Sequence, residues 1–292
     1  MSKYDYFNLE VLKHFGTYPN NTHLAKELLP KGEPLQLEAL RKYIAKMRKH
    51  AHPKEAKDGV KSLKKYLAIE PYLNGNPDNI LIIGDPHEPF TLLGYLKFCR
   101  EQQEIYDCGT VVFIGDIIDN HYSSYHESDP DGYGAGEELD RTIDKIKDWY
   151  RTFPRAKVIV GNHDRLVYRK AFSAGVSKRW IRDYKDVLGT PDWEFMESVE
   201  IFGINFNHGE GGTAKNRMKT ELQSQVQGHL HTQLYAEFSV GANFIVFGMQ
   251  VGCGIDIKSY AMAYGKHYKK PAIGCGVVLN KGTLPIAIPM KM

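Results

Sequence analysis

The sequence predicts an α/β domain over residues 76–292, preceded by a small basic helical module over residues 1–75. Short apolar, β-branched runs alternate with helix-like stretches such as residues 91–103 and 137–150, and this alternation is typical of α/β folds. After His231 the sequence becomes mainly strand-like. Late antiparallel strands that complete a sheet would explain this change. The expected strands are residues 234–240, 243–249, 274–279 and 284–288.

The basic charge of the chain is concentrated in its N-terminal quarter. Residues 1–70 contain 14 Lys and Arg against 8 Asp and Glu, whereas the remainder contains 24 against 27. A helix expected from about Pro34 would carry apolar side chains on one face and Lys42, Lys46 and Lys49 on another. Short helices with a basic last member resemble a helix-turn-helix module, which binds in a DNA groove. A packing or dimerisation domain would show the same pattern, so DNA contact and packing both stay open.

Length and composition are those of a folded protein with an apolar core. The 292 residues suit one large domain with a smaller appendage, and contents of 42% hydrophobic and 25% charged residues are ordinary. No run of about eighteen apolar residues occurs, and the first residues lack an apolar signal core, so we expect no membrane contact and a cytoplasmic location. The four cysteines form no Cys-x-x-Cys pair, which fits a reduced intracellular protein.

Five apolar, β-branched runs each end on side chains that commonly bind metals. Their endings read Gly-Asp-Pro-His, Gly-Asp-Ile-Ile-Asp, Gly-Asn-His-Asp, His-Gly and Gly-His-Leu-His. Open sheets gather their active sites at the carboxyl ends of their strands, so we expect these side chains to converge. Any one of them alone is more often structural, but seven together favour a cage for metal ions. The candidate ligands are Asp85, His87, Asp116, Asn162, His208, His229 and His231.

The ligand types favour two divalent transition-metal ions. Two-metal hydrolases hold their ions about 3.5–4 Å apart, with a carboxylate between them, and Asp116 is placed to bridge the pair. Mixed nitrogen and oxygen ligands without a thiolate suit Mn²⁺, which we expect first, and also Fe, Zn²⁺ or Co²⁺, better than Ca²⁺.

In their order along the chain, the motifs Asp-x-His, Gly-Asp-x-x-Asp, Gly-Asn-His-Asp, His-Gly and Gly-His-x-His resemble those of the calcineurin-like metallophosphoesterases. The similarity covers roughly residues 80–232 and implies a four-layer αββα sandwich with the metals at one edge. It implies a first ion held by Asp85, His87, Asp116 and His231. It implies a second ion held by Asp116, Asn162, His208 and His229.

The resemblance also implies a mechanism, in which a hydroxide between the two ions attacks phosphorus. His163 would protonate the leaving oxygen or steady the developing charge. Asp119 matches the Asp that orients this His in the protein-phosphatase branch of the family. An Asp at that position would also suit a helix N-cap, and the two roles are compatible.

Two departures favour the phosphodiesterase and nuclease branch of the family. Asn120 stands where the Ser/Thr protein phosphatases carry an Arg that binds the phosphate dianion, and those enzymes lack the paired Gly-His-x-His. We therefore expect a phosphodiesterase that acts on nucleic acid or a nucleotide. A phosphomonoesterase (a small-molecule or protein phosphatase) and a DNA-binding, nucleotide-sensing regulator are the alternatives.

Further side chains near the motifs are candidates for contact with the substrate. Loops with Tyr, His, Gly and basic residues follow the bridging Asp and the His-Gly motif, and such residues can stack on bases or bind phosphates. The candidates are Arg165, His121, His126, Lys215 and Arg217. The segment from Gly252 resembles phage or prophage members of the family, which favours a nucleic acid or nucleotide substrate.

Overall fold

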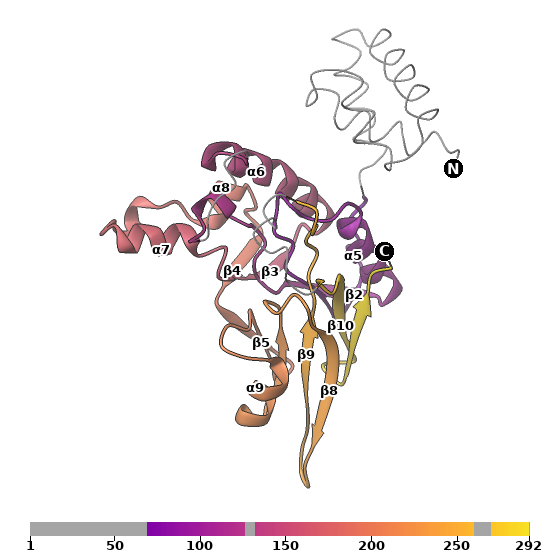
Figure 1. Ribbon diagram of the computed structural model, residues 1–292. Helices are drawn as coiled ribbons and strands as arrows, with labels where there is room; N and C mark the ends of the chain where they lie inside the picture. The colour runs from indigo at the N-terminus through magenta and orange to yellow at the C-terminus, as the bar shows by residue number, and fades with distance from the viewer. Residues whose placement is uncertain (1–68, 126–131, 260–269, 292) are drawn as a thin grey trace, which may run out of the picture. The chain divides into compact units, whose positions relative to one another are not determined.

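The computed structural model describes residues 69–125, 132–259 and 270–291. The chain divides into two units between Ala68 and Ile69, and only the second, Ile69–Met292, is described. The prediction of a helical module over residues 1–75 therefore lies almost wholly outside the described residues. The described domain contains two sheets and several helices, which confirms the predicted α/β class (Figure 1).

The first sheet has six strands in the order β11-β10-β1-β2-β3-β4. Strands β1 to β4 run parallel to one another, whereas β10 and β11 join antiparallel. The late antiparallel strands predicted to complete a sheet are therefore confirmed for β10 and β11. The strands are β1 Asn76–Ile83, β2 Cys108–Phe113, β3 Ala156–Ile159, β4 Trp193–Met196, β10 Gly274–Leu279 and β11 Leu284–Pro289.

The second sheet has five strands in the order β5-β6-β7-β9-β8. Strand β6 is parallel to β7, and β7 is parallel to β9, so β6 and β7 end at the same edge of this sheet. The late strand-like region is thus divided between two sheets, which the alternation of residue types alone did not reveal. The strands are β5 Ser198–Ile201, β6 Ile204–Asn207, β7 Ser224–Gln227, β8 Leu234–Val240 and β9 Ile245–Val251.

The two helices expected within the described residues are confirmed, with shifted ends. Residues 91–103 contain most of α5, and residues 137–150 lie within α6. Within the described ranges, three further α-helices and two short 3₁₀ helices were not anticipated. The helices are α5 Tyr95–Ile105, α6 Ala135–Thr152, α7 Leu166–Ser173, α8 Tyr184–Leu188, α9 Ala214–Glu221, η1 His121–Ser123 and η2 Lys178–Trp180. None of the helices in the described ranges is long and apolar enough to cross a membrane.

Strand β1 shows how the layers pack. Its last four side chains, from Ile80 to Ile83, are apolar and fully buried, because this part of the strand is covered on both faces. Leu81 and Ile83 belong to a cluster with residues of α5 and α6, whereas Ile80 and Ile82 belong to a cluster with the second sheet. On the far face of that sheet, the backbone at the start of α9 is bonded to Gln250 of β9. The order of layers is therefore helices, sheet, sheet and helix, as the resemblance implied.

Candidate metal centre

The candidate ligands lie on loops that leave five neighbouring strand ends. Strands β1, β2 and β3 are parallel, so the loops after them meet at one edge of the first sheet. The loops after β6 and β7 meet at the same end of the second sheet. Three of the ligand residues, His87, Asp116 and His229, have positive φ angles of 53°, 45° and 65°. Such backbone conformations cost about 1–3 kcal/mol each and are concentrated at functional sites.

Two glycines of the motifs leave room for ligands of other loops. A Cβ at Gly161 would overlap the Asp116 carboxylate, and a Cβ at Gly228 would overlap the carboxylate of Asp85. Each glycine directly precedes a candidate ligand of its own loop. The Gly-Asn-His-Asp and Gly-His-x-His motifs therefore require glycine because the loops pack against one another at the centre.

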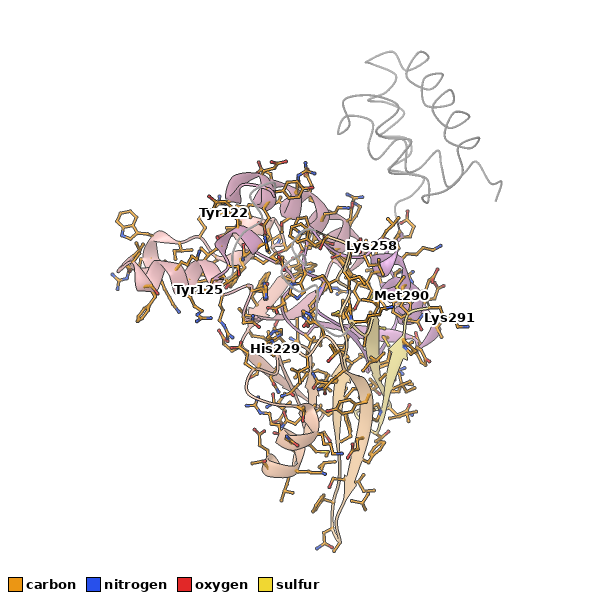
Figure 2. The ribbon with its side chains drawn as sticks, in the orientation of Figure 1. Tyr122, Tyr125, His229, Lys258, Met290 and Lys291 are labelled. Carbon is orange, nitrogen blue, oxygen red and sulfur yellow. The ribbon has the colours of Figure 1, made fainter. Side chains whose placement is uncertain are left out.

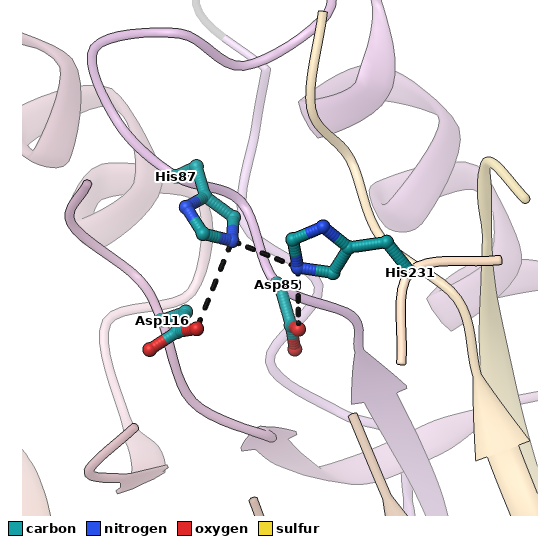
Figure 3. Close-up of side chains that lie close together, drawn as sticks. All are labelled: Asp85, His87, Asp116 and His231. Atoms are coloured by element: carbon teal, nitrogen blue, oxygen red, sulfur yellow. Dashed lines mark hydrogen bonds and ion pairs between the residues drawn. The ribbon is translucent and has the colours of Figure 1, made fainter. Parts of the chain in front are cut away.

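The first group of candidate ligands comprises Asp85, His87, Asp116 and His231, whose ligand atoms all lie within 4.8 Å of one another. Nε2 of His231 lies 3.0 Å from Nε2 of His87 and 3.2 Å from Oδ2 of Asp85 (Figure 3). Nε2 of His87 lies 3.8 Å from Oδ2 of Asp116. His87 and the two carboxylates are buried, whereas the His231 side chain is 27% exposed. The group can therefore be reached from solvent on the His231 side.

The second group shares Asp116 with the first. Ligand atoms of Asp116, His208 and His229 lie within 4.8 Å of one another. Nε2 of His208 lies 3.1 Å from Oδ2 of Asp116 and 3.0 Å from Oδ1 of Asn162. Nδ1 of His208 lies 3.0 Å from the carbonyl oxygen of Ile114, which fixes the ring and leaves Nε2 facing the group. All seven predicted ligands are thus brought together around Asp116.

The electrostatics of the centre fit a bound cation. Burial raises the pKa of Asp116, but His208 and His163 outweigh it and hold the pKa well below its usual value. Burial lowers the pKa of His208, but the Asp116 charge outweighs it and raises the pKa to about 10. A positive charge beside Asp116 is therefore favoured. Oδ1 of Asp85 is buried and has no hydrogen-bond partner among the described residues, and a buried carboxylate oxygen in that state suits a metal ligand.

His163 and Asp119 lie together, but not through the contact that was expected. Oδ1 of Asp119 lies 2.7 Å from Nδ1 of His87 and 3.5 Å from Nδ1 of His163. Nδ1 of His163 instead lies 2.6 Å from the carbonyl oxygen of Asp119. The Asp119 carboxylate therefore chiefly orients a candidate metal ligand, and the backbone of Asp119 orients His163. Because Nδ1 of His163 must donate to that carbonyl, Nε2 is the nitrogen left to face a substrate.

Asp164 ties two ligand loops together and had no role in the sequence interpretation. Its carboxylate accepts the backbone N–H of Ile118 at 3.1 Å and that of Gly161 at 2.8 Å. It therefore joins the loop of Asp116 to the loop of Asn162. Burial and the charge of Asp116 raise the pKa of Asp164 to about 7. Its position as the last residue of the Gly-Asn-His-Asp motif is the sequence feature that could have indicated this role.

Glu138 of α6 fixes the segment that follows Asp119. Its carboxylate accepts the backbone N–H groups of His121 at 2.6 Å and Tyr122 at 2.9 Å, at the start of η1. The side chain is buried, and burial raises its pKa. No motif marks Glu138 in the sequence, because its two partners lie 17 and 16 residues away.

The basic side chains predicted to contact substrate are already paired with carboxylates. Arg165 is bonded to Glu197 at 2.7 Å and is also paired with Glu210. Lys215 and Arg217 lie on α9, where a phosphate-binding loop was expected, and their partners are Glu237 and Glu221, each at 2.8 Å. His121 is buried beside the Asp119 segment, and His126 lies outside the described residues.

One comparison, with models of protein families, agrees with the geometry of the centre. The model of the calcineurin-like phosphoesterase family matches residues 79–239, which is more than half of the chain. Vacuolar protein sorting 29 of Cryptosporidium parvum is 16% identical, with 68% of this chain and 83% of that chain covered and a TM-score of 0.35. The nuclease MPE of Pseudomonas putida is 15% identical, with 71% and 87% covered and a TM-score of 0.35.

The phosphoesterase Yfce of E. coli is 13% identical, with 72% of this chain and 99% of that chain covered and a TM-score of 0.35. Identities and scores this low assign no activity. No protein in a search of curated sequences matches the chain. The match to the family, over the segment that carries all seven candidate ligands, identifies the chain as a member of the calcineurin-like phosphoesterases and hence as a metal-dependent phosphoester hydrolase.

Proposed function

We propose that the protein is a dinuclear-metal phosphodiesterase that acts on nucleic acid or nucleotides. The observation that supports this most is the position of Asp116, a buried carboxylate shared by two groups of candidate ligands. One shared carboxylate between two ligand groups is the arrangement that two-metal hydrolases use.

In this proposal Asp85, His87, Asp116 and His231 hold the first ion. Asp116, Asn162, His208 and His229 hold the second ion. Only two of these seven side chains are anionic, so two divalent ions would leave the centre with an excess of positive charge. A phosphate ester and a hydroxide would offset that excess. The mixed nitrogen and oxygen donors favour Mn²⁺, with Fe, Zn²⁺ and Co²⁺ as alternatives.

Bound ions would supply an activated water and neutralise charge on the phosphoryl oxygens. The residues of the chain would do the remaining work. His163 would give the proton on Nε2 to the leaving oxygen as the bond between phosphorus and that oxygen breaks. The carbonyl of Asp119 holds the His163 ring in place at 2.6 Å. The Asp119 carboxylate holds His87 at 2.7 Å, which keeps Nε2 of His87 directed at the first group.

A diester substrate is favoured over a monoester by the state of the nearby basic groups. A monoester is a dianion, and enzymes that bind it commonly use a free guanidinium. Asn120 stands in the position of the protein-phosphatase Arg, and its amide donates to the carbonyl oxygen of His163 at 3.0 Å. Arg165, the N-cap residue of α7, is paired with two carboxylates. A diester carries one negative charge and depends less on such a group.

The test compares Mn²⁺-dependent hydrolysis of bis-p-nitrophenyl phosphate with that of p-nitrophenyl phosphate, with and without chelator. We expect faster hydrolysis of the diester, and loss of both activities with chelator. Asp116→Asn should abolish turnover, whereas Asp144→Asn, at an exposed position on α6, should not change it. Faster hydrolysis of the monoester would favour the phosphomonoesterase. Nucleotide binding without any turnover would favour the nucleotide-sensing regulator.

We also propose that residues 1–75 form a separate basic module that contacts DNA. The charge of residues 1–70, with 14 Lys and Arg against 8 Asp and Glu, supports this. Deletion of the module should weaken DNA binding by the full chain and reduce its salt dependence, while hydrolysis of the small diester persists. Equal DNA binding by the full and shortened chains would contradict this role.

A further inference from the structure

We propose that residues 166–182, which we name the arm, form a binding surface for single-stranded nucleic acid beside the metal centre. This inference rests on the proposed function, because the bound strand would be the substrate. The arm consists of α7, a turn at Gly175 and the short helix η2. Helix α7 extends away from the two sheets (Figure 1). Every residue from 172 to 180 is exposed.

The arm carries uncompensated positive charge. Within residues 166–182 there are five Lys and Arg and no Asp or Glu. None of these five has a carboxylate partner within 4.0 Å in the described part of the chain. The five are Arg169, Lys170, Lys178, Arg179 and Arg182. Unpaired Lys and Arg along one projecting element are the electrostatic signature of a surface that binds phosphates.

Elsewhere on the described surface, several basic side chains of α5, α6 and α9 are paired with acidic ones. On α5, Lys97 is paired with Glu101. On α6, Lys147 is paired with Asp144 at 2.8 Å. Arg165, Lys215 and Arg217, which the sequence suggested as phosphate contacts, are also paired. The positive charge of the arm, unlike that of these paired side chains, is therefore available to a polyanion.

The arm also exposes large aromatic side chains. Trp180 is 85% exposed and Phe172 is 82% exposed, although side chains of this size are usually at least partly covered. Arg169 and Lys170 lie over the ring of Tyr125, at 5.2 and 5.6 Å from its centre. Tyr125 lies near the base of α7 (Figure 2). Alternating cations and open aromatic faces match the way proteins bind single strands, with phosphates on the cations and bases stacked on the rings.

The arm is continuous with the ligand loop of Asn162. The backbone N–H of Leu166, the first residue of α7, donates to the carbonyl oxygen of His163 at 3.1 Å. The N–H of Arg165 donates to the carbonyl oxygen of Gly161 at 3.2 Å. A strand held along the arm would therefore reach the metal centre next to His163. An anionic membrane also attracts Lys, Arg and Trp, but continuity with a centre that cleaves phosphodiesters favours nucleic acid.

The test measures binding of the full chain to a labelled single-stranded oligonucleotide by fluorescence anisotropy, in chelator so that cleavage cannot occur. The variant Arg169→Gln/Lys170→Gln/Arg179→Gln removes three arm charges. We expect its affinity to fall about tenfold or more, and the slope of log affinity against log salt to fall by about 2. The matched control, Lys97→Gln/Lys147→Gln/Arg151→Gln, removes three charges from α5 and α6 and should bind as the unaltered chain does.

A second measurement reports on stacking alone. The chain has three tryptophans, and Trp149 and Trp193 are only 1% and 2% exposed, so quenching of emission on binding should come from Trp180. Trp180→Ala should weaken binding about fivefold or more, whereas Trp180→Phe should keep most of the affinity. Turnover of the small diester by each variant is measured alongside.

The outcomes separate the arm from the proposed function. Hydrolysis of the small diester together with undiminished oligonucleotide binding by both arm variants would overturn the arm and leave the proposed function standing. Arm-dependent binding without hydrolysis of any diester would overturn the proposed function and support the arm. Tighter arm-dependent binding of duplex than of single strand would overturn the inference. So would a Trp180 response to vesicles of phosphatidylglycerol and phosphatidylcholine without a response to the oligonucleotide.

Discussion

The two sheets contribute different side chains to the metal centre. Loops of the six-stranded sheet supply Asp85, His87, Asp116 and Asn162, which include every carboxylate and the amide of the predicted set. Loops of the five-stranded sheet supply His208, His229 and His231, which are all imidazoles. Each group of candidate ligands contains members from both sheets. Neither sheet alone could therefore hold an ion with the full set, and bound metal would connect the two halves of the sandwich.

Because the two sheets supply different ligands, substitutions in each sheet should affect metal binding differently. Loss of a carboxylate ligand, Asp85 or Asp116, from the first sheet would remove negative charge that favours bound cations. Displacement of the second sheet would move three imidazole ligands without removing a carboxylate. We therefore expect separable effects from four kinds of change. These are the loss of a charged ligand, the loss of packing between the sheets, the removal of metal and the loss of a group that orients a ligand.

The largest effect is expected for the shared carboxylate. Asp116→Asn should lower kcat/KM for the diester by about 10⁴-fold, about 5 kcal/mol in transition-state stabilisation, because both ligand groups lose their common anion. Steady-state hydrolysis in Mn²⁺ measures this, with Asp144→Asn as the exposed control. Activity within tenfold of the unaltered enzyme would refute the assignment of Asp116 as the bridge.

The packing between the sheets gives the next effect. Phe206 of β6 is fully buried between the sheets, two residues before His208, and Phe206→Ala should destabilise the fold by about 3–5 kcal/mol. Phe153, at the end of α6, is 1% exposed in the other core cluster, and Phe153→Ala should cost a similar amount. Only Phe206→Ala should also weaken metal affinity, measured by competition with a chelator. Equal affinities in the two variants would remove the proposed coupling between inter-sheet packing and the centre.

Removal of metal should loosen the connection between the sheets. At a metal concentration about 100 times the dissociation constant, binding stabilises the native state by about 2.7 kcal/mol. For a domain of this size, that corresponds to a rise in Tm of roughly 5–10 °C. Thermal unfolding in Mn²⁺ and in chelator measures the difference, and Asp116→Asn should abolish it. A Tm that is the same in both conditions would mean that the centre does not hold the sheets together.

The smallest effect is expected for the residue that orients His87. Asp119→Asn removes the carboxylate that lies 2.7 Å from Nδ1 of His87, and should weaken metal affinity by about 10- to 100-fold. Isothermal titration with Mn²⁺ measures this, again with Asp144→Asn as control. A fall in kcat with unchanged metal affinity would mean that the Asp119 carboxylate acts through His163, as the resemblance implied. That result would contradict the assignment of the carboxylate to His87 and of the carbonyl to His163.

The structure agrees with the sequence patterns for features that depend on residues close together along the chain. The runs that end at Asp85, Asp116 and Asn162 are strands, as predicted, because β-branched apolar runs bounded by glycine form buried strands irrespective of their partners. Helix α7 was not anticipated, because its eight residues are too few for a helical period to stand out in the sequence. The pairing of Arg165 with Glu197 was not anticipated either, because the two lie 32 residues apart.

The sequence by itself determined the types of ligand, their order along the chain and their places at strand ends. In these motifs the residue types follow from local needs: glycine where two loops pack closely, and histidine and aspartate where a side chain can bind a metal. Only the tertiary structure decided which carboxylate faces which imidazole, which basic groups are neutralised and which remain open on the arm. Those relations depend on contacts between segments far apart along the chain, and a linear pattern does not encode the distance between two side chains that folding brings together.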